Sequence, residues 1–308
     1  MKISVVLCTY NGEAFLVEQL DSIRLQTKSV AEVLIADDRS TDSTVHIIKE
    51  YIEKYKLSET WKLNINEKNK GYANNFHDIM MRATGDIIFL SDQDDIWNND
   101  KVEKMAKKME EMPEIQLLGT EFTPFYSSDH APQYTKKSKN DNNLYKIEIN
   151  RKNIFIDNGC EGCAVCVRKN FLHQINKYWF PGFPHDEFVW KMSLCYQGCY
   201  KWNISLMNRR FHENNTSKQK LHDKNKRIQF LENLLKSHMA MMQCANDRLL
   251  PLDDRKLISK NIKSVETRIR VLKNRSIFAG LKGVVKYYRY YQSWKSPIME
   301  LYIAFFGK

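Results

Sequence analysis

The sequence predicts an α/β fold in which a mostly parallel sheet is flanked by helices and followed by an α-helical extension. Within residues 1–97, four short apolar runs alternate with stretches of helical periodicity. Each run is almost continuously apolar, as expected for strands buried on both faces. Parallel strands need crossover connections, which the helical stretches supply. From about residue 218 onward the periodicity is helical only.

The first strand is expected at residues 2–9 (KISVVLCT), where β-branched residues are frequent. A helix is expected next, at 11–27, with Asn11 as a candidate cap. Its apolar stripe has the spacing of one helix face. The stripe consists of Leu16, Leu20, Ile23 and Leu25.

The same alternation continues along the chain. The apolar run at 32–38 ends in two aspartates, and capping residues open an amphipathic helix at 40–56. Strands are then expected at 61–66 and 86–92, with a helix at 71–84 between them. Four parallel strands with helical crossovers follow from this order.

The middle of the chain is less regular. Helices are expected at 99–112 and 186–196, and the polar stretch 126–153 indicates a long surface loop. GCAVCVRK (162–169) fits an apolar strand that leads into a short helix. The overlapping CEGCAVC (160–166) has a spacing found in metal clusters, but no Pro-flanked fourth cysteine follows, so buried thiols are the preferred interpretation.

Composition limits the class of protein. The chain has 308 residues, of which 43% are hydrophobic, so it can bury a substantial core. Its N-terminus lacks an apolar signal region, and no window of 18 residues is uninterruptedly apolar, so we expect neither secretion nor a spanning helix. Seven cysteines are scattered along the chain, and free thiols are expected.

The positive charge is concentrated at one end. Residues 217–308 contain 20 Lys and Arg against 7 Asp and Glu, whereas the rest contains 28 against 30. This asymmetry predicts a polyanionic partner for the tail, such as a phospholipid surface, an anionic polymer or nucleic acid.

Polar side chains collect where three of the predicted strands end. Ligands of open parallel sheets bind outside the carboxyl ends of the strands, so these side chains are candidates for one site. They are Thr9, Tyr10 and Asn11 after the first strand, Asp37 and Asp38 after the second, and Asp92, Asp94 and Asp95 after the fourth.

The chemistry of these side chains suits a nucleotide. Tyr10 can stack on a base, and Asp38 can accept hydrogen bonds from a base imide or a ribose hydroxyl. The carboxylates of SDQDD (91–95) are hard ligands for Mg²⁺ or Mn²⁺, which would bridge a diphosphate. Neither GxGxxG nor GxxxxGK[ST] is present, so a metal would replace the phosphate loops.

The order VVLCTYNG, IADDRSTDST, NKGYANN, GDIIFLSDQDD resembles family 2 glycosyltransferases, which have a Rossmann-like GT-A fold. LSDQDDIW is similar to the bacterial rhamnosyltransferase-like branch that builds cell-surface polysaccharides and capsules. The resemblance covers about residues 1–216 and implies a nucleotide-sugar-binding part at about 1–97 and an acceptor part at about 98–216. Residues 217–308 form the basic extension.

The resemblance implies a role for each matching residue. It places Asp186 as the catalytic base, with Glu187 as the alternative, and Asn215 as a supporting residue. Asp94, Asp92 and His212 would hold Mn²⁺ or Mg²⁺, and Asp92, Asp95 and Arg210 would lie at the donor diphosphate. The nucleotide-binding set is Thr9, Tyr10, Asn11, Asp38, Asn69, Gly71 and Asn75.

Each candidate also has a purely structural interpretation. The Asp92–Asp95 cluster could be a solvated turn, although densely packed carboxylates repel one another without a counter-ion. The remaining interpretations are local. Asp38 and Asp186 could be helix caps, and Tyr10 could simply pack in the core. His212 could be a hydrogen-bonded loop residue, and Arg210 could form a surface salt bridge.

The sequence therefore predicts an inverting, metal-dependent glycosyltransferase. It would transfer a sugar, with rhamnose from dTDP-rhamnose as the first hypothesis and a UDP-hexose or UDP-N-acetylhexosamine donor as the alternative. The acceptor would be a lipid-linked or surface glycan. Direct displacement with one base would invert the anomeric carbon of the sugar. The enzyme would work on the cytoplasmic face of the membrane. A non-catalytic basic docking or nucleic-acid-binding protein is the alternative from another class.

The tail has two compatible interpretations. Cationic residues interleaved with aromatic ones at 279–307 suit a helix in a membrane interface. Alternatively, the tail helices pack on the catalytic part or form a homodimer, with a solvated basic face. Nucleic acid is not the expected partner.

Overall fold

The structure is a computed structural model, and it describes residues 1–135, 140–150, 159–213, 223–275, 280, 283, 285–291 and 296–306. Its centre is one sheet in the order β3-β2-β1-β4-β8-β6-β9-β5, and β7 pairs with β9. The strands are β1 Ile3–Thr9, β2 Glu32–Asp37, β3 Trp61–Ile65, β4 Ile87–Ser91, β5 Ile96–Trp97, β6 Leu117–Tyr126, β7 Leu144–Lys146, β8 Val165–Arg168 and β9 Cys199–Phe211.

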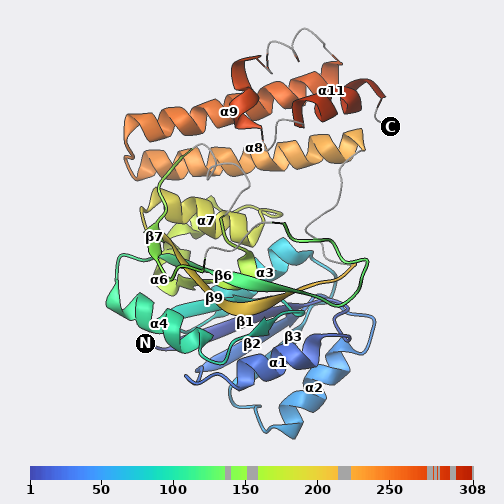
Figure 1. The fold of residues 1–308 in the computed structure, drawn as a ribbon, viewed down its shortest axis with the longest axis vertical. Helices are drawn as coiled ribbons and strands as arrows, with labels where there is room; N and C mark the ends of the chain where they lie inside the picture. The colour runs from blue at the N-terminus through green and yellow to red at the C-terminus, as the bar shows by residue number, and fades with distance from the viewer. Residues whose placement is uncertain are drawn as a thin grey trace.

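Helices cover both faces of this sheet (Figure 1). They are α1 Leu16–Arg24, α2 Thr44–Lys54, α3 Tyr72–Arg82, α4 Lys101–Glu111, α6 Lys169–Ile175, α7 His185–Cys195, α8 Lys224–Asp247, α9 Leu252–Asn274 and α11 Ser296–Phe306. Short 3₁₀ turns are η1 Gly162–Ala164, η2 Asn176–Tyr178 and η4 Tyr288–Tyr290. The predicted α/β class is confirmed.

The sheet is parallel through β3, β2, β1 and β4, as the alternating pattern predicts. Its second half is mixed. β8 runs antiparallel to both β4 and β6, and β9 is parallel to β6 but antiparallel to β5 and β7. The strands from the first 91 residues are thus the regular part of the sheet.

The strands bury alternate residues on opposite faces. Val5 and Leu7 pack with α1, α2 and α4 in one core cluster, whereas Val6 packs with α3, α6 and α7 in the other. All three side chains are fully buried. Two-sided burial explains why these strands are continuously apolar in sequence.

Several local predictions are corrected. α1 begins only at Leu16, because Asn11 has a positive φ of 49° and its side chain accepts the Thr41 amide instead of capping a helix. Leu25 lies outside the apolar stripe and is half exposed. Residues 162–164 form a 3₁₀ turn before β8, and the expected loop 126–153, where described, contains β7.

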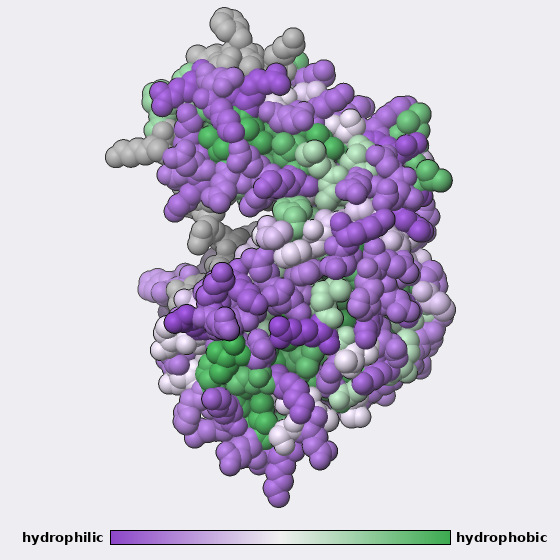
Figure 2. All heavy atoms as spheres, turned by 180° about the vertical axis from the view of Figure 1, so that it is seen from behind, coloured by the Kyte–Doolittle hydropathy of each residue, from purple (hydrophilic) through white to green (hydrophobic). Residues whose placement is uncertain are grey.

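The C-terminal helices form a layer on α7. Met241 and Cys244 of α8 are fully buried in the α7-side cluster, and α9 and α11 pack with α8 in a third cluster. Figure 1 shows this layer stacked beyond α7, and Figure 2 shows the molecule narrowing where the layer joins the rest. The packing interpretation of the tail thus matches the fold. Within the described ranges, no helix meets the length and apolarity needed to span a bilayer.

A candidate active site at the strand ends

The carboxyl ends of β1, β2 and β4 lie side by side. The register pairs Thr9 with Asp37 and Leu7 with Ser91. The Asp38 amide also donates to the Thr9 carbonyl at 2.8 Å. The loops after the three strands therefore start from one edge of the sheet, as the sequence predicts for parallel strands.

Thr9 and Asn11 hold the β1 and β2 loops together. The buried Thr9 hydroxyl donates to Asp37 Oδ2 at 2.8 Å, and Ser40 Oγ donates to the same oxygen at 2.5 Å. The Asn11 amide donates to Ser40 Oγ at 2.9 Å. Thr9 is only 2% exposed, so its structural contribution is to order the loop that follows β1.

Tyr10 projects from this edge. Its side chain is 48% exposed, so the packing interpretation does not describe it. Its backbone is held by Gln93, whose Oε1 accepts the Tyr10 amide at 2.8 Å and whose Nε2 donates to the Tyr10 carbonyl at 3.1 Å. Gln93 thus joins the DxD segment to the β1 loop, a contact that sequence reasoning missed because the middle residue of a DxD motif carries no charge.

Asp38 binds backbone amides and does not cap α2. Its Oδ1 accepts from the Lys70 amide and its Oδ2 from the Gly71 amide, both at 2.8 Å. Asn66 Nδ2 also donates to Oδ1 at 2.9 Å. The carboxylate is 3% exposed and fixes the loop before α3, whose N-cap is Gly71.

The rest of the predicted nucleotide set supports this loop. Asn69 Oδ1 accepts the Gly71 amide at 3.0 Å, and Gly71 has φ +78°, a conformation that glycine adopts without strain. Asn75 is 2% exposed, donates to the Ala36 carbonyl at 2.9 Å and accepts from Asn66 at 2.7 Å. Asn75 therefore positions the loop from below.

Asp92 and Asp95 lie against each other beside the thiol of Cys163. One carboxylate oxygen of Asp92, one of Asp95 and the Sγ of Cys163 all lie within 4.8 Å of one another. Burial, followed by the neighbouring carboxylates, raises the pKa of Asp92 well above its usual value and that of Asp95 to about 6. Asp95 Oδ2 is buried and lacks a hydrogen-bond partner among the described residues.

Asp94 turns to His212 instead. His212 Nε2 and Asp94 Oδ2 are 2.8 Å apart, so this histidine belongs to the carboxylate cluster and not to an unrelated loop. Arg210 holds the same segment, because its amide donates to Asp95 Oδ1 at 3.1 Å and its Nε donates to the Asp94 carbonyl at 3.0 Å. Arg210 is 7% exposed and also pairs with Glu18.

Arg209 is a cation that sequence reasoning did not assign. It pairs with Glu161 at 3.0 Å, and its charge favours ionisation of Asp92 and Asp95. Its position in the SLMNRRF end of β9, next to Arg210, was the available signal. Asn215, the predicted support for this segment, lies outside the described residues.

Asp186 lies in the first turn of α7, and Pro184 takes the N-cap position. Burial and the charges of Asp95 and Asp94 raise the pKa of Asp92, and the charge of Asp186 acts in the same direction to a smaller extent. A Cβ on Gly162 would come within 3.0 Å of Asp186 Cβ, so a glycine lets the Cys163 segment approach this turn.

Glu187 faces away from the cluster, into the protein. Its Oε1 forms an ion pair with Lys191, and Ser237 Oγ donates to the same oxygen at 2.7 Å. Lys191 is fully buried. A carboxylate that neutralises a buried ammonium is poorly suited to exchange protons with a substrate, which favours Asp186 over Glu187 as the base.

The cluster can accommodate a divalent cation. The unpartnered Asp95 oxygen and the mutual repulsion of the three aspartates are both relieved by a positive ion, and carboxylate oxygens suit Mg²⁺ or Mn²⁺. The predicted ligand set was Asp94, Asp92 and His212. The described residues add Asp95 and Cys163 to the candidates.

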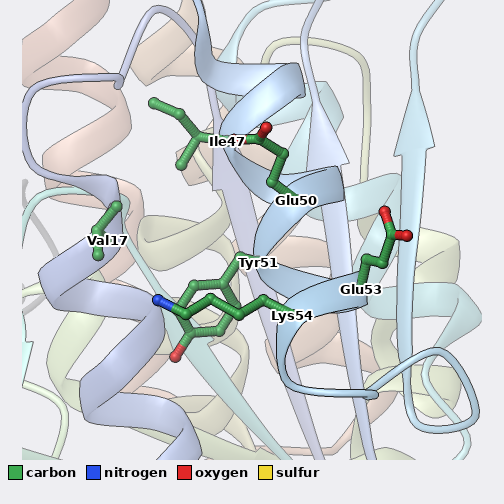
Figure 3. Close-up of a pocket in the computed structure, with 6 residues that line it drawn as sticks. All are labelled: Val17, Ile47, Glu50, Tyr51, Glu53 and Lys54. Atoms are coloured by element: carbon green, nitrogen blue, oxygen red, sulfur yellow. The ribbon is translucent and has the colours of Figure 1, made fainter.

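One hollow described by the structure lies elsewhere. It has a volume of about 550 Å³ and is lined by Val17 of α1 and by one face of α2 (Figure 3). The lining residues of α2 are Ile47, Glu50, Tyr51, Glu53 and Lys54. None of them belongs to the strand-end cluster, so this hollow is not the candidate site.

Comparisons with known proteins agree with the fold and the motifs. The sequence model described as glycosyl transferase family 2 matches residues 4–173, which is more than half of the chain. The dTDP-rhamnosyl transferase RfbG of Shigella flexneri is 28% identical over 222 residues, covering 68% of this chain and 72% of that protein. Curated relatives that are 36% identical match a shorter stretch, and the chain spans only 33% to 42% of their length.

Two solved structures share the fold at low identity. The S. aureus TarS 1–349 complex with UDP-GlcNAc has a TM-score of 0.64 at 17% identity, covering 94% of this chain and 90% of that one. Mannosyltransferase PcManGT from Pyrobaculum calidifontis, in complex with GDP-Man and Mn²⁺, has a TM-score of 0.54 at 14% identity. It covers 98% of this chain and 85% of that one.

Proposed function

The chain belongs to glycosyl transferase family 2, and on this premise we propose that it is an inverting, metal-dependent transferase of a sugar from a nucleoside diphosphate to a glycan hydroxyl. The observation that carries the proposal is the gathering of Asp92, Asp94 and Asp95 between β4 and β5, next to Cys163, with Asp186 in the first turn of α7 beside the adjoining Gly162. A base and a diphosphate-binding cluster are the two parts that direct transfer needs. Residues 1–216 form the catalytic part of this proposal, and 217–308 its extension.

The donor nucleoside lies across the ends of β1 and β2. Tyr10 offers an exposed ring for the base, and the loop that Asp38 fixes through the Lys70 and Gly71 amides forms the opposite wall. Because Asp38 and Asn75 are buried, they act by holding this wall in place. The diphosphate then extends toward the aspartate cluster.

Transfer takes place in one displacement. The Asp186 carboxylate accepts the proton of the acceptor hydroxyl while that oxygen forms a bond to the anomeric carbon. The bond from this carbon to the diphosphate oxygen breaks, and the electron pair leaves with the nucleoside diphosphate. Arg209 and Arg210 lower the energy of the departing charge. A single attack from the opposite face inverts the anomeric centre, unlike the two attacks of a retaining enzyme.

Asp92, Asp94, Asp95 and His212 would hold Mn²⁺ or Mg²⁺, which when bound neutralises the diphosphate. The Mn²⁺ in the PcManGT complex supports this proposal. Arg210 also orders this segment, because its Nε donates to the Asp94 main-chain carbonyl and its amide donates to Asp95 Oδ1. Oxygen ligands alone do not discriminate between Mg²⁺ and Mn²⁺.

The first candidate donor is dTDP-rhamnose, because RfbG is named a dTDP-rhamnosyl transferase. A UDP-N-acetylhexosamine or UDP-hexose is the second candidate, because the TarS structure holds UDP-GlcNAc. The acceptor is a lipid-linked or surface glycan. The competing proposal of a non-catalytic docking protein predicts that nucleotide sugars do not bind.

Thermal unfolding tests the donor site first. We expect one dTDP or UDP sugar to raise the unfolding midpoint only when Mn²⁺ is present, because a ligand that binds the folded state stabilises it. At a concentration about 100 times the dissociation constant, the gain is about 2.7 kcal/mol. Asp94→Ala should abolish the metal-dependent part of the shift.

A matched control is Asp129→Ala, an exposed carboxylate outside the cluster. It should leave the shift intact. Absence of a shift for every nucleotide and nucleotide sugar, with either metal, would refute the donor site and favour the docking protein.

The extension contacts the cytoplasmic face of the membrane through α11 in our proposal. One face of α11 is buried against α8 and α9, whereas Ile298, Tyr302 and Phe306 are 64%, 58% and 73% exposed. Their spacing places them on one side of the helix. The net positive charge of 217–308 complements anionic phospholipid. In Figure 2, hydrophobic atoms lie exposed among hydrophilic ones on the upper, helical layer.

Co-sedimentation with vesicles of anionic and neutral phospholipid tests this surface. The triple variant Ile298→Ser, Tyr302→Ser, Phe306→Ser should lower vesicle binding by at least about tenfold, because each buried apolar side chain contributes roughly 1.5–3 kcal/mol. The double variant Leu249→Ser, Leu252→Ser changes exposed residues at the α8–α9 turn and should bind normally. If the triple variant binds equally well but changes the oligomeric state, α11 is instead a homodimer surface.

A further inference from the structure

Cys163 lies at the base of the aspartate cluster, and nothing in the proposed mechanism uses it. It is 1% exposed and lies in the 3₁₀ turn Gly162–Ala164. Its carbonyl accepts from the Nζ of Lys101 at 2.8 Å, and that nitrogen lies 3.9 Å from the Trp97 ring. Lys101 is fully buried, so the turn is anchored from inside the protein.

The thiol lies beside two carboxylates. Cys163 Sγ and one oxygen each of Asp92 and Asp95 lie within 4.8 Å of one another. Asp95 is 1% exposed, its Oδ1 is engaged by the Arg210 amide, and its Oδ2 is buried without a hydrogen-bond partner in the described part of the chain. A buried carboxylate oxygen beside a thiol is a pair of ligand atoms that a cation would satisfy together.

The other cysteines are not in this position. Cys166 is fully buried on β8, two positions before the end of the strand, and it does not join a group of three ligand atoms among the described residues. The spacing CEGCAVC therefore does not form a cysteine cluster in the described residues. It contributes one thiol to a carboxylate site.

We propose that Cys163 makes this metal centre a mixed sulfur and oxygen site that binds thiophilic divalent cations such as Zn²⁺ and Cd²⁺ in competition with Mn²⁺. Carboxylates alone favour hard cations, whereas a thiolate selects softer ones. On binding, a bond forms between the sulfur and the cation, and the thiol proton leaves to solvent. With Mg²⁺ or Mn²⁺ the thiol stays protonated.

This inference shares one assumption with the proposed function, namely that the aspartate cluster is the metal site for the donor. It predicts that traces of Zn²⁺ occupy the site and exclude the catalytic cation. The Cys163→Ser variant keeps the oxygen ligands, but Zn²⁺ should no longer displace the catalytic cation from it.

Cd²⁺ titration of the metal-free full-length protein tests the proposal without turnover. Cadmium bound to thiolate absorbs in the ultraviolet, so the wild type should develop one equivalent of this absorbance in its tightest phase. Cys163→Ser should lose that phase, whereas Cys166→Ser should keep it. Displacement of bound Mn²⁺, followed by electron paramagnetic resonance, should need at least about tenfold more Cd²⁺ in Cys163→Ser than in the wild type.

Two outcomes would overturn the proposal. One is a tight phase that survives in Cys163→Ser, and the other is equal displacement of Mn²⁺ in both proteins. If Cys163→Ser does not fold, Asp95→Asn provides the second variant, because it keeps the thiol and removes the neighbouring charge, and it should weaken Cd²⁺ binding. Binding of Mn²⁺ and nucleotide sugar without a thiolate band would refute this inference and leave the proposed function standing.

Discussion

Replacing Asp186 with asparagine is expected to lower kcat by about 10³-fold, within the range for loss of a general base. Asparagine keeps the size of the side chain and cannot accept the acceptor proton. We expect the variant to fold, because Asp186 is half-buried in the first turn of α7 and an asparagine Oδ1 can still accept the Glu187 amide that Asp186 Oδ1 accepts at 2.8 Å. Steady-state kinetics with the donor identified by thermal unfolding measure the loss of kcat. The donor-induced shift of the unfolding midpoint should be the same in the variant and the wild type.

Glu187→Gln is the matched comparison, since it is the adjacent carboxylate and the alternative base. Here the expected loss is of stability and not of chemistry, because Lys191 would remain buried without its anionic partner. Breaking a buried ion pair costs about 3–5 kcal/mol. If Glu187→Gln lowered kcat more than Asp186→Asn at equal folded fraction, the assignment of the base would be reversed.

The sequence was sufficient to predict the N-terminal half of the sheet because its strands are buried on both faces. Residues 2–9 and 86–92 are apolar runs that few other structures can accommodate, and β1 and β4 lie within them. The second half of the sheet was less predictable. β9 alternates buried and half-exposed residues over Cys199–Phe211, and its polar positions hide it among loops.

The site was predictable where function requires charge at a strand end. Asp92, Asp94 and Asp95 are too costly to place at the end of a buried strand without a ligand, and this pattern is visible in one sequence. The pairing of His212 with Asp94 was within reach only through the family resemblance, because 118 positions separate them. Gln93 was missed because an amide signals nothing until its neighbours in space are known, and CEGCAVC was interpreted as buried thiols because its spacing does not show that Cys163 lies beside Asp92 and Asp95.

The C-terminal layer depends on a buried charge cluster that the basic composition conceals. Glu300 of α11 is 3% exposed and accepts hydrogen bonds from Arg268 of α9 and Arg227 of α8. Arg268 is 1% exposed. Burial opposes ionisation of Glu300, but the two guanidinium groups outweigh it and hold the pKa of this carboxyl below its usual value. Three helices therefore meet at one carboxylate.

Glu300→Ala is expected to lower the free energy of unfolding by about 3–5 kcal/mol, because it leaves two largely buried guanidinium groups without an anion. Glu232→Ala is the control: it removes an exposed pair with Lys273, 2.7 Å long, between the same helices α8 and α9, and should cost at most about 1 kcal/mol. Urea unfolding followed by circular dichroism measures both. Equal losses in the two variants would contradict the role of burial.

The same cluster predicts an acid-labile helical layer. Because the folded pKa of Glu300 is lowered, its contribution to stability is fully present above the unfolded value of about 4.3 and is lost as the pH falls through the lower folded value. The difference in unfolding free energy between wild type and Glu300→Ala should therefore shrink below about pH 4. A difference that stays constant between neutral and acidic pH would show that Glu300 stabilises the layer by packing alone.

Replacing Glu300, Arg227 and Arg268 together with methionine should restore stability, because it removes the buried charges as a set.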